Sequence, residues 1–126
     1  PYANPETDPN IGYLVRHEHK DLFYTDSSAQ TRTCEGVKAV ALVFRTKYAA
    51  QRVLSGMKHA VTVVEAPIYH IVCIQDGPEA QPQYYTKAQT FEFCPIQRAA
   101  RLSNLEAEVL RAKLPHKNVL IKEYAA

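Results

Sequence analysis

The fold is decided by the stretch YHIVCIQDGPEAQPQYYT, residues 69–86. Its first part, Ile71 to Ile74, is a short apolar run rich in β-branched residues, which is typical of a largely buried strand. Asp76-Gly77-Pro78 predicts a turn, because glycine and proline both interrupt regular structure. Tyr84-Tyr85-Thr86 predicts the second strand, so the whole stretch indicates a β-hairpin.

The same order of elements is found once before in the chain. Tyr13-Leu14-Val15 opens a strand-like run, Phe23-Tyr24-Thr25 follows it, and the charged stretch 16–21 forms the hairpin tip. Each pair of strands is followed by a helical pattern and by a β-branched strand that ends in glutamate, residues 61–65 and 119–123. The sequence therefore predicts a tandem repeat; two unrelated segments that share this order are the alternative.

Both helices have recognisable beginnings. Thr46 is the predicted N-cap of the first helix, and the residues that recur at helical spacing after it are Ala49, Ala50, Val53, Leu54 and Met57. The second helix begins with a capping box formed by Ser103 and Glu106, and Pro115 ends it. Its predicted apolar face consists of Leu105, Val109, Leu110 and Ala112.

These elements predict an α+β fold made of two tandem ββαβ-type repeats. One copy alone would bury too little apolar surface, so we expect a pseudo-twofold domain with both helices on one face of a mainly antiparallel sheet. Residues 1–11 are predicted to be an N-terminal extension of a single domain, 12–126, in which repeat one is 12–66 and repeat two is 69–124.

Composition restricts the class of protein. The 126 residues are 46% hydrophobic and carry a net charge of +2, which favours a folded domain and does not by itself indicate a nucleic-acid binder. No apolar run is long enough to cross a bilayer, and the first ten residues do not resemble a signal peptide. Three widely spaced cysteines favour buried reduced thiols and a cytoplasmic location, in a host cell if the chain is phage-encoded.

One part of the chain resembles a family of short phage and prophage proteins of uncharacterised function. The resemblance covers residues 12–66 and rests on Phe23-Tyr24-Thr25, on Ala41-Leu42-Val43-Phe44-Arg45-Thr46-Lys47 with Ala50, and on Val61 to Glu65. The second copy matches through Tyr84-Tyr85-Thr86, Ala99 to Ser103 and the last strand, but Leu102 and Ser103 replace Phe44 and Thr46. The resemblance implies a phage-type origin and specifies no chemistry.

Catalytic and metal-binding motifs are weak. His17 and His19 form an H-x-H pair that would point to one face of a strand, but their charged neighbours favour a solvated hairpin tip. The sequence contains no G-x-S-x-G and no glycine-rich phosphate loop. We therefore expect a non-enzymatic protein without a metal or cofactor.

The combination of tyrosines and basic residues favours nucleic-acid binding. Exposed strand aromatics beside lysine and arginine bind single strands, with each stacked base worth about 1–3 kcal/mol. The predicted base-stacking residues are Tyr24, Tyr84 and Tyr85, and the predicted phosphate contacts are Arg45, Lys47, Arg52, Lys58, Arg98 and Arg101. Cross-strand tyrosine packing and an ordinary solvated helix face are the alternatives for these residues.

Two further functions agree with the same residues. Exposed tyrosine and arginine are also typical of protein interfaces, which predicts a phage-encoded inhibitor or adaptor that binds a host protein. Self-association through a sheet edge, as in an assembly component, is the third hypothesis. No membrane partner is expected.

Overall fold

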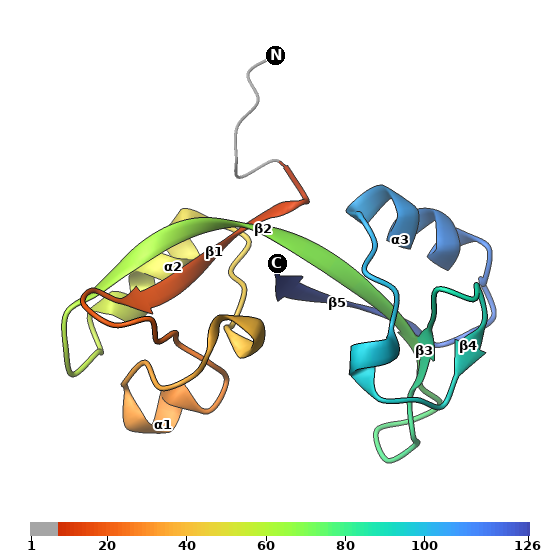
Figure 1. Cartoon of the computed structure of the whole chain (residues 1–126), viewed down its shortest axis with the longest axis horizontal. Coiled ribbons are helices and arrows are strands. Elements are labelled where there is room, and N and C mark those ends of the chain that lie inside the picture. Colours follow the sequence, from red (N-terminus) through yellow and green to blue (C-terminus); the bar gives the residue numbers. More distant parts are fainter. Residues whose placement is uncertain (1–7) are drawn as a thin grey trace. The chain divides into compact units, whose positions relative to one another are not determined.

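The computed structural model describes residues 8–126 and has an α+β fold with a mainly antiparallel sheet (Figure 1). In chain order the elements are β1 (Ile11–His17), α1 (Ser28–Thr31), η2 (Lys38–Val40), α2 (Lys47–Leu54), β2 (Val61–Ile74), β3 (Gln83–Tyr85), β4 (Phe91–Glu92), η3 (Ile96–Arg98), α3 (Asn104–Ala112) and β5 (Val119–Ala125). The chain divides into two compact units. Unit one comprises the residues up to Ile68 together with Tyr124–Ala126, and unit two comprises Tyr69–Glu123.

Unit one is built on the antiparallel ladder between β1 and the first part of β2. The ladder runs from Ile11 opposite Pro67 to His17 opposite Val61. β1 is buried on both faces: Leu14 packs on one side with Phe23, Ala41, Ala66 and Ala125. Tyr13 and Val15 point to the other side, where they meet α2, because successive residues of a strand face opposite ways.

Helix α2 begins where the sequence predicts. The Thr46 hydroxyl accepts a hydrogen bond from the Ala49 N–H at 3.1 Å, which satisfies one of the otherwise unpaired donors of the first turn. Ala50 is fully buried against β1, and three predicted neighbours are half-buried around it: Val53, Leu54 and Met57. The predicted N-cap and apolar face of this helix are therefore confirmed.

Unit two contains the predicted hairpin and capping box. Cys73 pairs with Tyr84 across β2 and β3, β3 pairs with β4, and β5 pairs with β2 (Figure 1). Gly77 has a φ of 101°, which confirms the turn, since side chains other than glycine rarely adopt this conformation. Ser103 and Glu106 form both hydrogen bonds of the capping box, at 3.2 and 3.1 Å.

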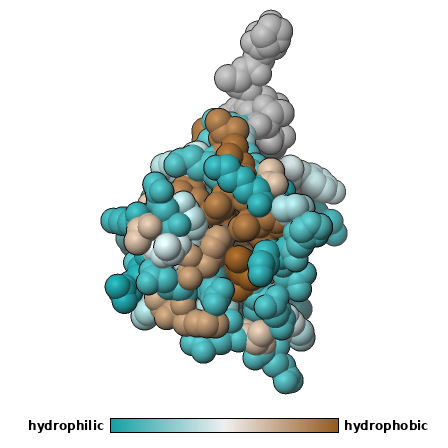
Figure 2. Space-filling view, turned by 90° about the vertical axis from the view of Figure 1, so that its right-hand side faces the viewer, coloured by the Kyte–Doolittle hydropathy of each residue, from teal (hydrophilic) through white to brown (hydrophobic). Residues whose placement is uncertain are grey.

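The predicted apolar face of α3 is wrong except at Leu110, which is half-buried, and Ala112 is exposed. Leu105 is 72% exposed and Val109 is 47% exposed, whereas Ala107 is fully buried. Leu105 and Val109 are four residues apart, and Ala107, Leu110 and Leu114 are also spaced by three and four, so the sequence offers two apolar stripes of equal periodicity. Figure 2 looks onto the side of unit two that carries α3, β3 and β4 and shows apolar side chains gathered among hydrophilic ones.

Three other expectations change. The strands predicted at 61–65 and 71–74 are one continuous strand, β2, because Pro67 lies at the end of the β1 ladder, where its missing N–H removes no ladder bond. Phe23 forms only isolated bridges to Arg16 and Gly36. Of the predicted N-terminal extension, residues 1–7 lie outside the described residues, and Ile11 already belongs to β1.

Two glycines of unit one are expected to differ sharply when changed to alanine. A Cβ at Gly36 would lie 2.3 Å from the Thr25 Cγ2, and buried Thr25 cannot move aside because its hydroxyl contacts the Ser28 hydroxyl at 3.2 Å. We expect Gly36→Ala to lower the free energy of unfolding by about 1–3 kcal/mol in urea denaturation. Gly56→Ala is the control, because its Cβ would have nothing nearer than 3.9 Å. Equal free energies of unfolding for the two variants would contradict this packing.

Candidate nucleic-acid interface

Unit one contains an open pocket of about 310 Å³ that is lined by two stretches of the chain, 24–32 and 52–57. Its described lining residues are Tyr24, Ser28, Ala29, Arg32, Arg52, Val53, Ser55, Gly56 and Met57. Two of them, Tyr24 and Arg52, were predicted from the sequence to bind nucleic acid. None of these lining residues is acidic, so the two arginine side chains set the charge of what we call the Tyr24 pocket.

Tyr24 is held in place by its backbone. Its N–H donates to the Val15 carbonyl and its carbonyl accepts from the Leu42 N–H, both at 2.9 Å. The ring lies 6.2 Å from the Phe44 ring, centroid to centroid, and is half-buried. One part of the phenol therefore packs on unit one while another part lines the pocket.

Arg32 has an unusual backbone conformation. It ends α1 with a φ of 57°, in the left-handed region that costs a residue with a side chain about 1–2 kcal/mol. The Arg32 N–H donates to the Ser28 carbonyl at 2.6 Å, and the Arg32 carbonyl accepts from the Lys58 N–H at 2.9 Å. These bonds hold an exposed arginine at the pocket in a conformation that glycine would adopt more easily.

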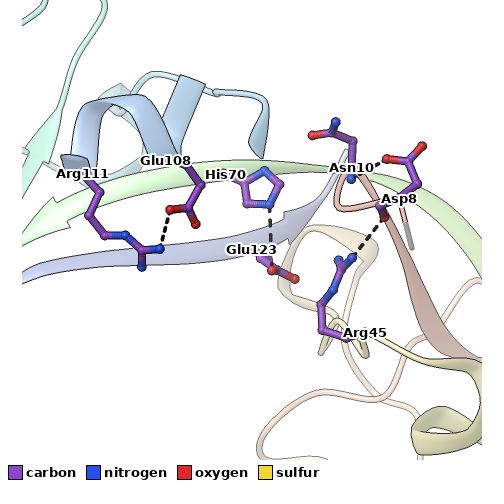
Figure 3. A network of polar contacts seen from close by, with 7 residues as sticks. All are labelled: Asp8, Asn10, Arg45, His70, Glu108, Arg111 and Glu123. Carbon is purple, nitrogen blue, oxygen red and sulfur yellow. Dashed lines mark hydrogen bonds and ion pairs between the residues drawn. The ribbon is translucent and has the colours of Figure 1, made fainter. Parts of the chain in front are cut away.

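Arg52 reaches the pocket from the exposed side of α2. Its guanidinium carbon lies 6.0 Å from the centroid of the Tyr48 ring, which is 70% exposed. Lys47 and Lys58 are also exposed on or just after this helix, although neither lines the pocket. Arg45 is half-buried, and its guanidinium donates to the Asp8 carbonyl at 3.1 Å (Figure 3), so it secures the segment before β1.

The predicted residues of unit two have different surroundings. Tyr84 is only 9% exposed, because it points into the core opposite Cys73, so it is corrected from a base-stacking residue to a core residue. Tyr85 is half-buried with its ring 5.4 Å from the Phe91 ring. Arg98 and Arg101 are exposed, and the Arg101 guanidinium lies 4.5 Å from the centroid of the Tyr69 ring.

A different hollow lies in unit two. It is larger than the Tyr24 pocket, but its lining has fewer groups that could bind nucleic acid. It measures about 400 Å³ and is lined by Gln75, Gly77, Pro78, Lys117, Asn118, Val119 and Leu120. This lining has one lysine and no aromatic ring. It therefore lacks the combination of stacking surface and multiple cations that a single strand requires.

Four of the five histidines lie in two places, and the fifth, His116, is exposed after α3. In unit one the His17 ring lies 4.4 Å from the His59 ring and 6.3 Å from the His19 ring. In unit two His70 is 1% exposed, its Nε2 lies 3.9 Å from a Glu123 oxygen (Figure 3), and no hydrogen bond to its ring is found among residues 8–126. Within the described chain, no three His, Cys, Asp or Glu side chains are grouped so as to hold a metal ion.

Sequence reasoning missed the α1 side of the pocket. Helix α1 has four residues, which is too short to show helical periodicity. The available signal was the run Thr25-Asp26-Ser27-Ser28, since such side chains hydrogen-bond nearby backbone; here the Ser28 hydroxyl accepts from the Thr25 N–H at 3.0 Å. Arg32 gave no signal, because a left-handed conformation is not expected of arginine.

Comparison with models of known protein families, with curated proteins and with solved structures finds no significant match to this chain. The resemblance to short phage proteins accordingly stays a prediction. Among residues 8–126, no helix combines the length and the apolar character that crossing a membrane requires.

The three cysteines are expected to differ in reactivity. All are free; burial raises the pKa of the Cys34 and Cys73 thiols, whereas Cys94 is only half-buried. Because the thiolate is the reactive form, Ellman's reagent at about pH 8 should label Cys94 quickly in the native protein and the other two only after unfolding. Cys94→Ser should remove the fast phase. A fast phase that persists in this variant would show that a buried thiol is accessible.

Proposed function

We propose that this chain is a non-enzymatic accessory protein that binds single-stranded nucleic acid at the Tyr24 pocket. The observation that carries the proposal is the convergence of Tyr24, Arg32 and Arg52, from two stretches of the chain, on one pocket without an acidic lining residue. A base stacks on the exposed part of Tyr24, and the two guanidinium groups bind adjacent phosphates. Exposed Lys47 and Lys58 extend the cationic surface along the strand.

The strained backbone of Arg32 supports this function. A left-handed arginine persists only where surrounding contacts compensate for it, and such residues concentrate at functional sites. The pocket volume lies near the lower end of ligand sites, roughly 300–1,000 Å³, which suits one nucleotide better than a duplex. Arginine also recognises phosphate better than lysine does, because its planar fork donates two parallel hydrogen bonds.

The proposal includes two tandem copies of one unit. Tyr13 and Phe44 exchange two backbone hydrogen bonds, at 2.9 and 2.8 Å, and His70 and Leu102 do the same in unit two, at 2.8 and 2.9 Å. The Tyr85 carbonyl accepts from the Ala100 N–H at 2.8 Å, as Tyr24 accepts from Leu42. Together with the resemblance of residues 12–66 to phage proteins, this pattern supports duplication of a phage-type unit.

The proposed copies differ on the exposed side of their helices. Ala50 and Ala107 each lie four residues after an N-cap and are fully buried. At the positions where α2 carries Tyr48 and Arg52, α3 carries exposed Leu105 and Val109. Nucleic acid is therefore assigned to unit one, and Tyr85, Arg98 and Arg101 of unit two offer only secondary contacts.

The alternative function, binding of a host protein, is favoured by the exposed apolar stripe Leu105 and Val109 on α3. Leu105→Ser combined with Val109→Ser separates the two functions, because it changes this stripe and leaves the Tyr24 pocket intact. Unaltered oligonucleotide affinity in that variant supports the pocket. Absence of oligonucleotide binding by the unmodified protein at low salt rejects nucleic-acid binding and favours the host-protein function.

Affinity for a fluorescein-labelled oligo(dT), measured by fluorescence anisotropy, should depend on salt and on the three pocket residues. We expect the affinity to fall roughly tenfold or more between about 50 and 200 mM salt, and Arg52→Gln and Arg32→Asn each to reduce the slope by about 0.7. Asparagine is chosen at position 32 because it tolerates the left-handed conformation. Tyr24→Leu, which keeps an apolar side chain against Phe44, should weaken binding by about 1–3 kcal/mol.

Lys87→Gln is the matched control, since Lys87 is exposed in unit two and far along the chain from the pocket residues. Its affinity and salt dependence should differ little from those of the unmodified protein. If Lys87→Gln weakens binding as much as Arg52→Gln does, the attraction is a general effect of charge and the pocket is not the binding site.

A further inference from the structure

Two histidine rings of unit one accept hydrogen bonds from backbone N–H groups. The His59 Nε2 accepts from the Cys34 N–H at 3.0 Å, and the His17 Nδ1 accepts from the His19 N–H at 3.0 Å. A nitrogen that accepts a hydrogen bond carries no proton, so both rings are neutral in this arrangement. If either ring nitrogen were protonated, its new N–H would point at the backbone N–H from which it now accepts a hydrogen bond.

The β1–β2 ladder brings these histidines together. Its last pair is His17 opposite Val61, and His59 lies two residues before Val61. The ring contact at 4.4 Å follows from this register and does not depend on the H-x-H spacing that the sequence suggested. His59 also reaches across 25 positions to Cys34, which is 2% exposed and packs in the core beside Val15.

The surroundings of the His17 ring disfavour its protonation. Partial desolvation, His59, Lys20, His19 and Arg16 all lower the pKa of His17 below its ordinary value of 6.5. Lys58 precedes His59 and adds another cation. Of the nearby carboxylates, Asp21 lies 3.5 Å from the Arg16 side chain and Glu35 accepts from the Thr33 hydroxyl at 2.8 Å, while Glu18 is exposed.

We infer that His59 and His17 form a proton-sensitive latch that holds the Arg32–Cys34 segment against the segment after α2. Two hydrogen bonds join these segments: Lys58 N–H to the Arg32 carbonyl and Cys34 N–H to the His59 ring. When His59 Nε2 takes up a proton, it can no longer accept from the Cys34 N–H, and the second bond is lost. The segment then keeps only one of the two hydrogen bonds that join it to the residues after α2, the one between the Lys58 N–H and the Arg32 carbonyl.

This latch regulates the proposed binding site, and that part of the inference rests on the proposed function. Arg32 lines one wall of the Tyr24 pocket, and Gly56 and Met57 line the other. The latch residues Cys34 and His59 each follow one of these walls by two residues, so their hydrogen bond joins the two walls. Release of Cys34 leaves the left-handed conformation of Arg32 with less support. Acidification should therefore weaken binding of the oligonucleotide at the Tyr24 pocket, even though the net positive charge of the protein rises.

The latch itself is tested without any nucleic acid, by the hydrogen-exchange protection factor of the Cys34 amide in NMR. In the unmodified protein we expect this factor to fall roughly fivefold or more between about pH 7.5 and 5.5. His59→Gln should keep it constant, because glutamine offers a non-titrating acceptor at a similar distance. His59→Ala should show low protection at both pH values.

The Tyr13 amide, which donates to the Phe44 carbonyl at 2.9 Å, is the reference for global stability. Its protection should stay constant while that of Cys34 falls. Constant Cys34 protection in the unmodified protein would overturn the latch. So would an equal fall at Tyr13, which would show unfolding of the whole unit, or an equal fall in His59→Gln.

The oligonucleotide affinity is then compared between unmodified protein and His59→Gln at both pH values. Both proteins are measured at the same two pH values, so the ratio of their affinities removes the pH effects that do not involve His59. The ratio of affinities, unmodified to variant, should fall roughly fivefold on acidification. An unchanged ratio beside the expected Cys34 exchange would reject regulation of the pocket, and absence of binding in both would reject the proposed function while leaving the latch established.

Discussion

The packing of unit one depends on a single strand, β1, which is buried on both faces. A strand in this position can shift by one residue only by moving Leu14 into the side occupied by Tyr13 and Val15. The antiparallel pairing with β2 therefore has one register, from Ile11 opposite Pro67 to His17 opposite Val61. Every functional feature of unit one is positioned relative to this ladder.

The edge of β1 opposite β2 and the end of the ladder support the proposed binding pocket and the proposed latch. The Val15 carbonyl accepts from the Tyr24 N–H, which turns one face of the phenol toward α2 and Arg52. The end of the ladder sets His17 against His59, which holds Cys34 and the segment that carries Arg32. The pocket and the proposed latch thus share one scaffold, and the short segment from Arg32 to Cys34 connects them.

Unit two shows how similar backbone contacts support a different surface. The exchange of hydrogen bonds between His70 and Leu102 repeats that between Tyr13 and Phe44, yet α3 presents Leu105 and Val109 where α2 presents Tyr48 and Arg52. Arg101 lies over the Tyr69 ring. The two pairs of backbone hydrogen bonds are therefore alike, whereas the exposed helix positions carry an aromatic ring and a cation in α2 and apolar side chains in α3.

Local signals in the sequence were enough to determine the elements whose causes are local. The Thr46 N-cap, the Ser103–Glu106 capping box and the turn at Gly77 were all readable, because caps and turns depend on neighbouring residues. Tertiary packing alone decided which of two equally periodic stripes of α3 is buried. It also decided that Arg32 adopts a left-handed conformation and that His59 binds Cys34, because long-range contacts outweigh local preference and leave no periodic trace in the chain.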